Sequence, residues 1–507
     1  MQPMHLNVQP NNGCRDAFAA TLRLCERMIS IALPRPSSST ETLQFGDSPE
    51  YTRVCGRFDG PGKTGMRERL RSALERVKEI PRPYYLRWVY FRLFNSKPPQ
   101  FSDCWQYPSW PLSSGLAQIL REAPPTGCFD LFILPMTDWH SRIQRTQQLA
   151  RALAALGHRV FCLNPSLGRQ FERPYLLDRM PRIAVLEQRV YEVHLRLPLE
   201  PVIYFRSLNR GEVRHLADSL APLMDVMRSR RMVQLVSLPS WTGLAEELRR
   251  RFRMPIVYDC HDFVRGFRGI RPSVVNLERR LFEVSDMIVF SSRKLMEITL
   301  EELPERSGKP LALIRNGVDS RHFAAELERE DSAVVATRPP NVAGYLGALD
   351  YWFDVHAVDE AARANRDWRF VLIGRTECEE ISRLRRNSNV EFAGEVPYAE
   401  LPRWVRRFKV GLIPFRRVPL TLAADPIKLY EYFSLGLPVV STRLPEVERF
   451  GDLVYLADTP AQFAAQVKAA GSEEDPSKRQ GRISASQRES WNTRAAQLVA
   501  AIEELNT

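Results

Sequence analysis

The chain has 507 residues, of which 44% are hydrophobic and 26% charged, and its formal net charge is +12. This length exceeds what one hydrophobic core usually supports, so we expect two globular domains with additional segments. The positive charge favours anionic partners without separating nucleic acid, acidic phospholipid and small anionic ligands. The eight cysteines form no CxxC pair and no Cys/His cluster at zinc spacing, which argues against a structural zinc site. No apolar run long enough to cross a bilayer and no secretory signal occur, so we expect a cytoplasmic protein.

Residues 1–125 carry the stretches PRPSSST and DGPGKTG, scattered prolines and few periodic apolar residues. This composition predicts an N-terminal extension that is largely disordered or basic and amphipathic, and that the rest of the chain does not need for folding. Within it, residues 67–94 mix arginines with Tyr, Trp, Phe and Leu, which suits a helix at a membrane interface. A solvated basic helix, or one packed on the main body, is the alternative. The GPGKT stretch at 60–64 is not a phosphate loop, because Arg57 stands where such a loop needs its first glycine.

From Phe129 onward, short apolar runs alternate with amphipathic helical patterns, which is typical of a parallel sheet covered on both faces. The first series, in residues 126–325, predicts strands in FDLFILP, RVFCLN, MVQLVSLP, PIVYDCHD, DMIVFSS and LALIRNGVD. A polar linker at 326–340 follows, and a second series in residues 341–475 predicts strands in NVAGYLGALD, WRFVLIG, NVEFAGE, VGLIPF and LPVVST. Residues 476–507 are predicted to form a C-terminal helix. We therefore predict an α/β chain with two doubly wound, Rossmann-like domains that face each other across a cleft, with ligands at the carboxyl ends of the strands.

Three stretches carry a family resemblance. They are DPIKLYEYFSLGLPVVST at 425–442 with LPE at 444–446, LIRNGVD at 313–319, and GYLG at 344–347. Together they resemble the glycosyltransferases of the GT-B fold, families 1 and 4, over residues 129–505. WHSRIQR at 139–145 and the YDCHD stretch are similar to bacterial enzymes that build exopolysaccharide and other cell-surface glycans. The resemblance implies transfer of a hexose-type sugar from a nucleotide diphosphate sugar to a lipid-linked or polysaccharide acceptor, with no metal and no further cofactor.

The 425–442 stretch contains the two residues to which the resemblance gives the most specific roles. Lys428 falls in the first turn of the helix that begins after Pro426, where its charge would meet the donor diphosphate. Glu431 follows on the same helical face, where its carboxylate would accept hydrogen bonds from the ribose hydroxyls. A surface lysine that pairs with Glu431 is the alternative. Retaining members of the family carry an earlier carboxylate with seven residues between, but this chain has Ala423 there, which puts retention of configuration in doubt.

Four other residues complete the predicted donor site. Arg315 and Asn316, in the RNG segment, would face the donor phosphates. Gly347 would let the backbone approach those phosphates closely. Arg375, directly after the strand WRFVLIG, would lie near the nucleobase or be merely solvated.

The first domain needs a base, because the acceptor hydroxyl loses a proton as it attacks the donor. Asp138 follows the first strand, and His261 with Asp262 follows PIVYDC, so both places are carboxyl ends of strands. As candidate catalytic residues we rank His261 first, Asp262 second and Asp138 third. A structural role for His261, with Asp262 capping the next helix, is the alternative.

Two other functions fit the same double fold. A sugar-nucleotide epimerase would release an altered sugar nucleotide without an acceptor. A catalytically silent subunit would bind the donor without turnover, which the departure at Ala423 allows. An anionic membrane surface is a further candidate partner, with attachment to the inner face of the plasma membrane. Nucleic acid is disfavoured, because the basic residues are dispersed and no aromatic-basic motif of a known module occurs.

Overall fold

The computed structural model describes most of the chain from residue 109 onward. The described residues are 82–83, 109–111, 114–122, 124–168, 180–200, 203, 207–227, 231–268, 270–302, 308–328 and 341–505. The chain divides into the units Met1–Ser72 and Ala73–Thr507, and every described residue belongs to the second unit. None of the helices in these ranges is both long and apolar enough to span a bilayer.

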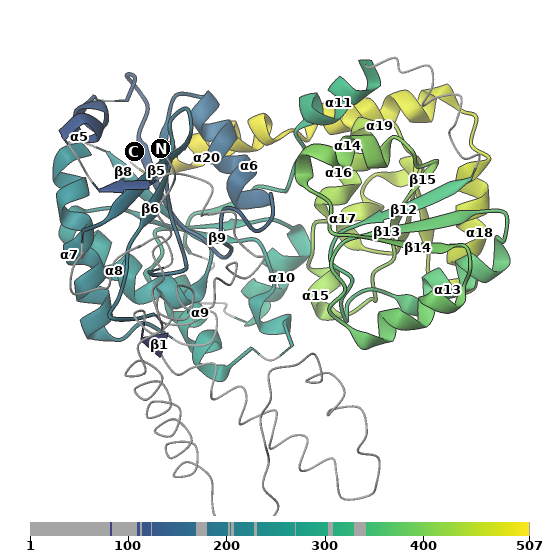
Figure 1. The fold of residues 1–507 in the computed structure, drawn as a ribbon, viewed down its shortest axis with the longest axis horizontal. Coiled ribbons are helices and arrows are strands. Elements are labelled where there is room, and N and C mark those ends of the chain that lie inside the picture. The colour runs from purple at the N-terminus through teal and green to yellow at the C-terminus, as the bar shows by residue number, and fades with distance from the viewer. Residues whose placement is uncertain are drawn as a thin grey trace, which may run out of the picture. The chain divides into compact units, whose positions relative to one another are not determined.

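Nine strands form the first sheet, in the order β11-β10-β9-β8-β3-β4-β6-β5-β2 (Figure 1). From β11 to β6 the neighbours are parallel, whereas β5 and β2 extend one edge as antiparallel strands. The predicted apolar runs supply the parallel strands, because a parallel sheet is buried on both faces. The bounds are β2 (Ser109–Pro111), β3 (Asp130–Leu134), β4 (Arg159–Leu163), β5 (Arg182–Glu187), β6 (Val190–His194), β8 (Met232–Val236), β9 (Ile256–Cys260), β10 (Met287–Phe290) and β11 (Leu311–Leu313).

Helices cover both faces of the first sheet. They are α6 (Arg145–Ala155), α7 (Arg210–Met227), α8 (Thr242–Phe252), α9 (Pro272–Val284), α10 (Arg293–Glu302) and α20 (Trp491–Glu504). Successive side chains of a strand point to opposite faces. In β3, Leu131 and Ile133 lie in a core with α6 and α20, whereas Phe132 and Leu134 lie in a core with α7, α8 and α9. The two separate cores are the physical basis of the doubly wound arrangement.

Six parallel strands form the second sheet, in the order β14-β13-β12-β15-β16-β17. The bounds are β12 (Val342–Leu346), β13 (Arg369–Ile373), β14 (Val390–Gly394), β15 (Val410–Ile413), β16 (Val439–Thr442) and β17 (Val454–Ala457). The main helices around it are α11 (Ser320–Glu328), α13 (Val355–Ala364), α14 (Leu401–Val405), α15 (Pro419–Leu422), α16 (Ile427–Ser434), α17 (Pro445–Glu448), α18 (Pro460–Gly471) and α19 (Pro476–Arg488). Both domains are therefore α/β, with predominantly parallel sheets, as the sequence predicted.

The end of the chain forms two helices where the sequence predicted one. Helix α19 ends at Arg488 and packs on α16, whereas α20 begins at Trp491 and runs beside α6 of the first domain (Figure 1). Ser490 separates them, because its side chain accepts a hydrogen bond from the Thr493 backbone N–H at 3.2 Å and so caps α20. Trp491 and Leu498 are buried in the first domain's core. The C-terminal helix thus completes the first domain.

Parts of the predicted N-terminal extension are folded. Strand β2 pairs with β5 at the edge of the first sheet, and α5 (Ser114–Arg121) packs on α7 with Leu120 buried. Arg82 and Pro83 form β1, which pairs with β7 (Leu199–Glu200), so a continuous helix over residues 67–94 is wrong at these two positions. The rest of residues 67–94, like most of residues 1–108, lies outside the described residues. The sequence analysis also missed the β5–β6 hairpin, whose turn places the non-glycine residue Arg189 at a φ of 64°.

Candidate active site

Gly347 and Lys428 meet at the carboxyl end of the second sheet. Gly347 follows β12, and Lys428 lies in the first turn of α16. A Cβ atom placed on Gly347 would lie 3.3 Å from Lys428 Cε and 3.4 Å from its Nζ. Gly347 also has a φ of 130°, which a residue with a side chain rarely adopts. The backbone of the loop after β12 therefore passes directly against the lysine.

The Lys428 side chain lies against aromatic rings in the described part of the chain. Its Nζ lies 4.6 Å from the centre of the Phe415 ring and 5.3 Å from that of Tyr345. It forms no ion pair or hydrogen bond with any residue of the described ranges, Glu431 included. Burial lowers the pKa of Lys428 to about 8, against a smaller opposing effect of the Glu431 charge. An anion bound beside Gly347 would supply the missing partner.

Glu431 is the second charged residue on α16. Its side chain is nearly inaccessible, and its carboxylate accepts no hydrogen bond within the part of the chain that the structure describes. Burial raises the pKa of Glu431 to about 7, and the Lys428 charge opposes this rise. A buried carboxylate without donors is costly unless a ligand supplies them. Hydroxyl groups are suitable donors.

Because nothing in the described structure pairs with Glu431, we expect Glu431→Gln to stabilise the ligand-free protein near pH 8. The folded pKa of about 7 lies above the unfolded value, so stability is lost as the pH rises through it. A gain of about 1 kcal/mol would raise the melting temperature by about 2 to 4 °C at pH 8, and the gain should vanish at pH 4. Thermal melting at both pH values tests this.

The matched control is Glu278→Gln. Glu278 is also buried with a raised pKa, but it accepts hydrogen bonds from Tyr258 Oη at 3.0 Å and Arg265 Nη1 at 2.9 Å. Its replacement should lower the melting temperature at pH 8. A destabilised Glu431→Gln protein at pH 8 would show that Glu431 has a structural partner after all.

Arg315 and Asn316 lie between the two domains. The Arg315 Nε donates to Glu446 Oε2 at 2.6 Å, and Glu446 also accepts from the Arg293 backbone N–H at 2.6 Å. The Asn316 backbone N–H donates to Asp425 Oδ2 and its amide donates to the Asp425 carbonyl, both at 2.7 Å. Burial raises the pKa of Asp425 to about 6, with the Glu446 charge adding to the effect. Both predicted donor residues are thus held by protein groups, and their contact with a donor stays a prediction.

Arg375 follows β13 and forms an ion pair with Glu377. Its carbonyl accepts a hydrogen bond from the Leu349 backbone N–H at 2.9 Å, so its loop lies beside the loop of Gly347. The structure therefore brings the backbone of Arg375 to the loop that contains Gly347.

His261 follows β9 and lies against two carboxylates. Its Nδ1 is 3.1 Å from the Asp259 carbonyl oxygen and 3.3 Å from Asp259 Oδ2, and its Nε2 is 3.7 Å from Asp262 Oδ2. Burial lowers the pKa of His261, but the hydrogen bond and charge of Asp259 outweigh it, so the net pKa is raised. Burial also raises the pKa of Asp262, whose side chain is about one third exposed.

Asp138 belongs to a different group of side chains. Its Oδ1 accepts from the His140 backbone N–H at 2.9 Å, and Asn164 Nδ2 lies 3.4 Å from its Oδ2. Asn164 and His140 also contact the buried Glu192, at 2.7 and 2.9 Å. Asp138 thus orders the loop after β3.

Four charged residues of this region were not predicted as site residues, although all of them lie in the motifs that carry the family resemblance: Arg145, Asp259, Asp425 and Glu446. Each is buried. The sequence feature that could have identified them is a charged residue inside an apolar or helical motif. Such a charge becomes buried on folding, and a buried charge needs a partner. Among the described residues, no group of three or more His, Cys, Asp and Glu side chains is arranged to hold a metal ion.

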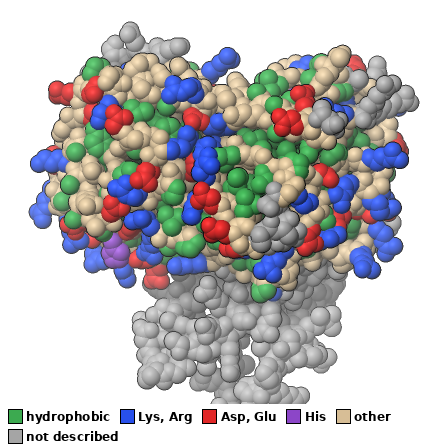
Figure 2. Space-filling view, turned by 180° about the vertical axis from the view of Figure 1, so that it is seen from behind, with side chains coloured by type: hydrophobic (Ala, Val, Ile, Leu, Met, Phe, Trp, Pro, Cys, Tyr) green, Lys and Arg blue, Asp and Glu red, His purple; other side chains and the backbone are tan. Residues whose placement is uncertain are grey.

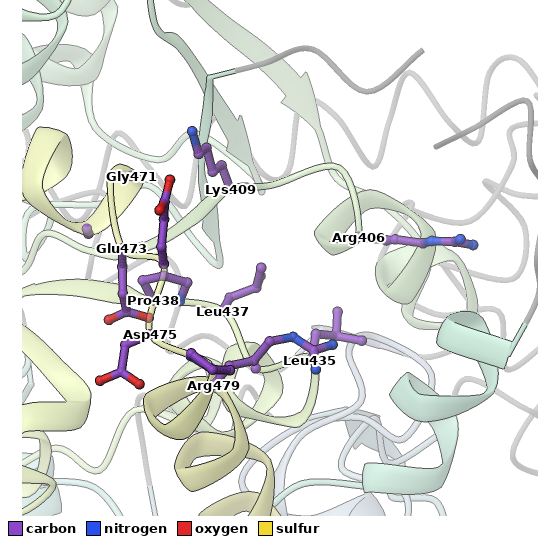
Figure 3. A pocket seen from close by; sticks show the side chains of 13 residues that line it. Arg406, Lys409, Leu435, Leu437, Pro438, Gly471, Glu473, Asp475 and Arg479 are labelled. Carbon is purple, nitrogen blue, oxygen red and sulfur yellow. The ribbon is translucent and has the colours of Figure 1, made fainter. Parts of the chain in front are cut away.

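A pocket of 470 Å³ lies at the opposite end of the second sheet (Figure 3). It is lined by residues at the starts of β15 and β16 and at the α18–α19 junction, including Lys409, Pro438 and Arg479. Arg406 points away from Arg479 in Figure 3, and both signs of charge line the walls. The pocket contains none of the predicted site residues, so the candidate active site is not this cavity.

Two α/β domains with predominantly parallel sheets, a C-terminal helix returned to the first domain, and charged residues at the carboxyl strand ends define the class: this is the GT-B fold. A sucrose-phosphate synthase from Thermosynechococcus elongatus aligns with a TM-score of 0.54 at 15% identity, over 75% of this chain and 99% of that one. A trehalose-phosphate synthase (UDP-forming) from Burkholderia vietnamiensis aligns with a TM-score of 0.55 at 14% identity, over 75% and 98%. At these identities the likeness shows the fold alone.

Sequence comparison gives the family. The family model "Glycosyltransferase Family 4" matches residues 144–322, and "Glycosyl transferases group 1" matches residues 340–471. A relative from Bacillus subtilis (strain 168), named "Putative teichuronic acid biosynthesis glycosyltransferase TuaH", is 27% identical over 254 residues. The match covers 47% of this chain and 64% of the relative, less than two thirds of its length. The chain is a GT-B glycosyltransferase of the group 1 and family 4 type.

Proposed function

We propose that the protein transfers a sugar from a nucleotide diphosphate sugar to a lipid-linked or polysaccharide acceptor during synthesis of a cell-surface glycan. The observation that carries the proposal is the Lys428 cation against Gly347, with Glu431 on the same helix, since neither side chain forms an ion pair or a hydrogen bond within the described ranges. The relative named for teichuronic acid synthesis supports the glycan class, and the neighbour named as UDP-forming supports a nucleotide donor.

The residues divide the proposed chemistry between the domains. The acceptor hydroxyl oxygen forms a bond to the anomeric carbon while the bond to the diphosphate oxygen breaks, and the diphosphate leaves with the electron pair. Lys428 and the positive end of α16 offset the charge that develops on the diphosphate, so the protein itself supplies the cation. Glu431 accepts hydrogen bonds from the ribose. His261 Nε2 takes the proton that the acceptor hydroxyl loses.

The environment of Ala423 bears on the stereochemistry of the proposed transfer, because retaining members of the family carry a carboxylate at this position. This residue is buried, and its carbonyl oxygen accepts a hydrogen bond from Ser292 Oγ of the first domain at 2.6 Å. Its side chain lies in the first domain's apolar core cluster. The position offers neither a carboxylate nor a polar environment for one, so the proposed transfer uses no second carboxylate there.

The donor is tested by thermal melting with UDP-, GDP- and ADP-sugars. A ligand that binds only the folded state at about 100 times its Kd adds about 2.7 kcal/mol of stability. We expect one nucleotide class to raise the melting temperature of the native protein and to leave Lys428→Ala less affected. Equal melting with all nucleotides at millimolar concentration would contradict the proposal. Release of an altered free sugar nucleotide without acceptor would assign the site to an epimerase instead.

Membrane attachment at the inner face of the plasma membrane is part of the proposal, supported by the net charge of +12 and the glycan class of the relative. On the face shown in Figure 2, Lys and Arg side chains are interspersed with Asp and Glu. A nucleic-acid groove would instead gather one sign of charge. This face therefore gives no support to nucleic-acid binding.

A further inference from the structure

A buried arginine and a buried aspartate form a fork behind His261. Arg145, at the start of α6, donates from Nε to Asp259 Oδ1 and Oδ2 at 3.0 and 3.1 Å, and from Nη2 to Oδ1 at 2.8 Å. Both side chains are almost fully buried. Burial raises the pKa of Asp259, but the Arg145 charge and the His261 hydrogen bond outweigh it and hold the net pKa well below its usual range. Asp259 is therefore a fixed anion.

The Asp259 anion determines which nitrogen of His261 carries the proton. Both atoms near His261 Nδ1, the Asp259 carbonyl oxygen and the Asp259 carboxylate, only accept hydrogen bonds. Nδ1 must then be the donor. In the neutral ring the lone pair consequently lies on Nε2, the nitrogen that faces away from Asp259. This is the tautomer that a base acting through Nε2 requires.

The same arginine reaches the segment between the domains. Its Nη1 donates to the Arg315 carbonyl oxygen and to Asn316 Oδ1, both at 3.1 Å. Asn316 in turn donates to Asp425, two residues before α16 begins. One guanidinium thus connects the His261 side of the first domain with the segment that leads to the donor helix.

We propose that Asp259 and Arg145 are positioning residues, which hold His261 in the Nδ1–H tautomer and align its Nε2 as the base for the acceptor. The inference rests on the proposed function for its catalytic meaning. Its structural content, the tautomer and proton affinity of one histidine, is measurable without turnover. The groups that face His261 are Asp259, Asp262 and Arg145.

The test is a pH titration of the full chain labelled with ¹⁵N-histidine, with the His261 signal identified through His261→Gln. We expect the neutral His261 ring to carry its proton on Nδ1. Asp259→Asn removes the charge but keeps an acceptor, so the His261 pKa should fall by about 1 unit or more. The acid limb of kcat/KM should then move to lower pH by the same amount. His158 is an internal reference for the opposite tautomer, because its Nδ1 accepts from the Phe129 backbone N–H at 3.1 Å.

Arg145→Lys is the second variant, because Asp259→Asn leaves a buried arginine with less compensation and is the more disruptive change. Lysine keeps the charge but cannot hold both carboxylate oxygens. We expect this variant to show a mixture of His261 tautomers and a lower kcat with an unchanged KM for the donor.

The chain offers a matched control in Arg159 and Asp130. Arg159 Nε and Nη2 donate to Asp130 at 2.7 and 2.6 Å, and this pair is equally buried at the opposite end of the same sheet. Asp130→Asn and Arg159→Lys should leave the His261 pKa and tautomer unchanged. If the Asp259 and Arg145 variants also leave them unchanged, the fork only holds the fold together and the inference is overturned. Absence of transferase activity in the native protein would overturn the proposed function while leaving the titration result standing.

Discussion

Lys428→Ala should lower the rate of the chemical step by about 100-fold to 1000-fold, while donor affinity falls much less. The magnitude is that of removing one preorganised charge or donor from a developing anion. Charge on the diphosphate grows as the sugar departs, so the lysine contributes more in the transition state than in the bound ground state. Single-turnover rates and calorimetric titration of the nucleotide diphosphate separate the two effects.

Two further variants make the Lys428 result specific. Lys428→Met keeps an apolar stem against Phe415 and Tyr345 but removes the charge, so it should fold normally and match the alanine variant in rate. Lys409→Ala should not change the rate, because Lys409 lies in the pocket at the other end of the sheet, with Nζ 3.4 Å from Asn341 Oδ1. Equal losses in the chemical step and in ground-state affinity would assign Lys428 to simple donor binding.

The pKa of Lys428 adds a pH signature. Because burial lowers this pKa to about 8, the free enzyme loses the cation as the pH rises through that value. The native kcat/KM should therefore fall on the alkaline side near pH 8. Lys428→Met has no such group and should lack this alkaline limb.

His261→Ala should lower turnover by about 100-fold or more and leave donor affinity nearly unchanged. A positioned base contributes about 100-fold to 10,000-fold, and His261 belongs to the domain that does not carry Lys428 and Glu431. The native acid limb, due to the histidine pKa that Asp259 raises, should disappear in the variant. Steady-state kinetics with an excess of acceptor and titration of the nucleotide measure both quantities.

Asp262→Asn is a second test of the same site, and His356→Ala is the control for the His261 result. Asp262 Oδ2 lies 3.7 Å from His261 Nε2, so its loss should reduce turnover as well, whereas His356 is largely exposed and should not matter. Near-normal turnover in both His261→Ala and Asp262→Asn would move the base to Asp138 or to the substrate itself.

The sequence predicted the strands well where one physical cause dominates. Strands buried on both faces must be apolar throughout, so runs such as FDLFILP and WRFVLIG correspond to β3 and β13. The β5–β6 hairpin has mixed polarity, and its turn uses Arg189 rather than glycine or asparagine, so the usual turn signal was absent. Strand β2 has only three residues, too few for a periodic pattern.

The sequence supplied the motifs of the candidate site but not the pairings of its side chains. Lys428 and Glu431 were named from one motif and Gly347 from another, and the structure places Lys428 against Gly347. Arg145 and Asp259 are 114 residues apart in the chain, and their pairing depends on how the fold brings the start of α6 to β9. No local sequence pattern can predict a pairing between residues so far apart in the chain. The sequence does show that each residue is charged and lies in a segment that is predicted to be buried. Each of them therefore needs a partner, but the sequence does not identify that partner.

The return of α20 to the first domain has a consequence for how the protein is made. The first domain's core on the α6 side includes Trp491, Ala495, Leu498 and Ile502, which follow the whole second domain in the chain and therefore leave the ribosome after it. Until they arrive, the apolar face of the sheet that holds Leu131, Ile133 and Leu149 has no cover from α20. The second domain, whose strands end at Ala457, can complete its sheet earlier. The domain synthesised first is therefore the one that finishes folding last.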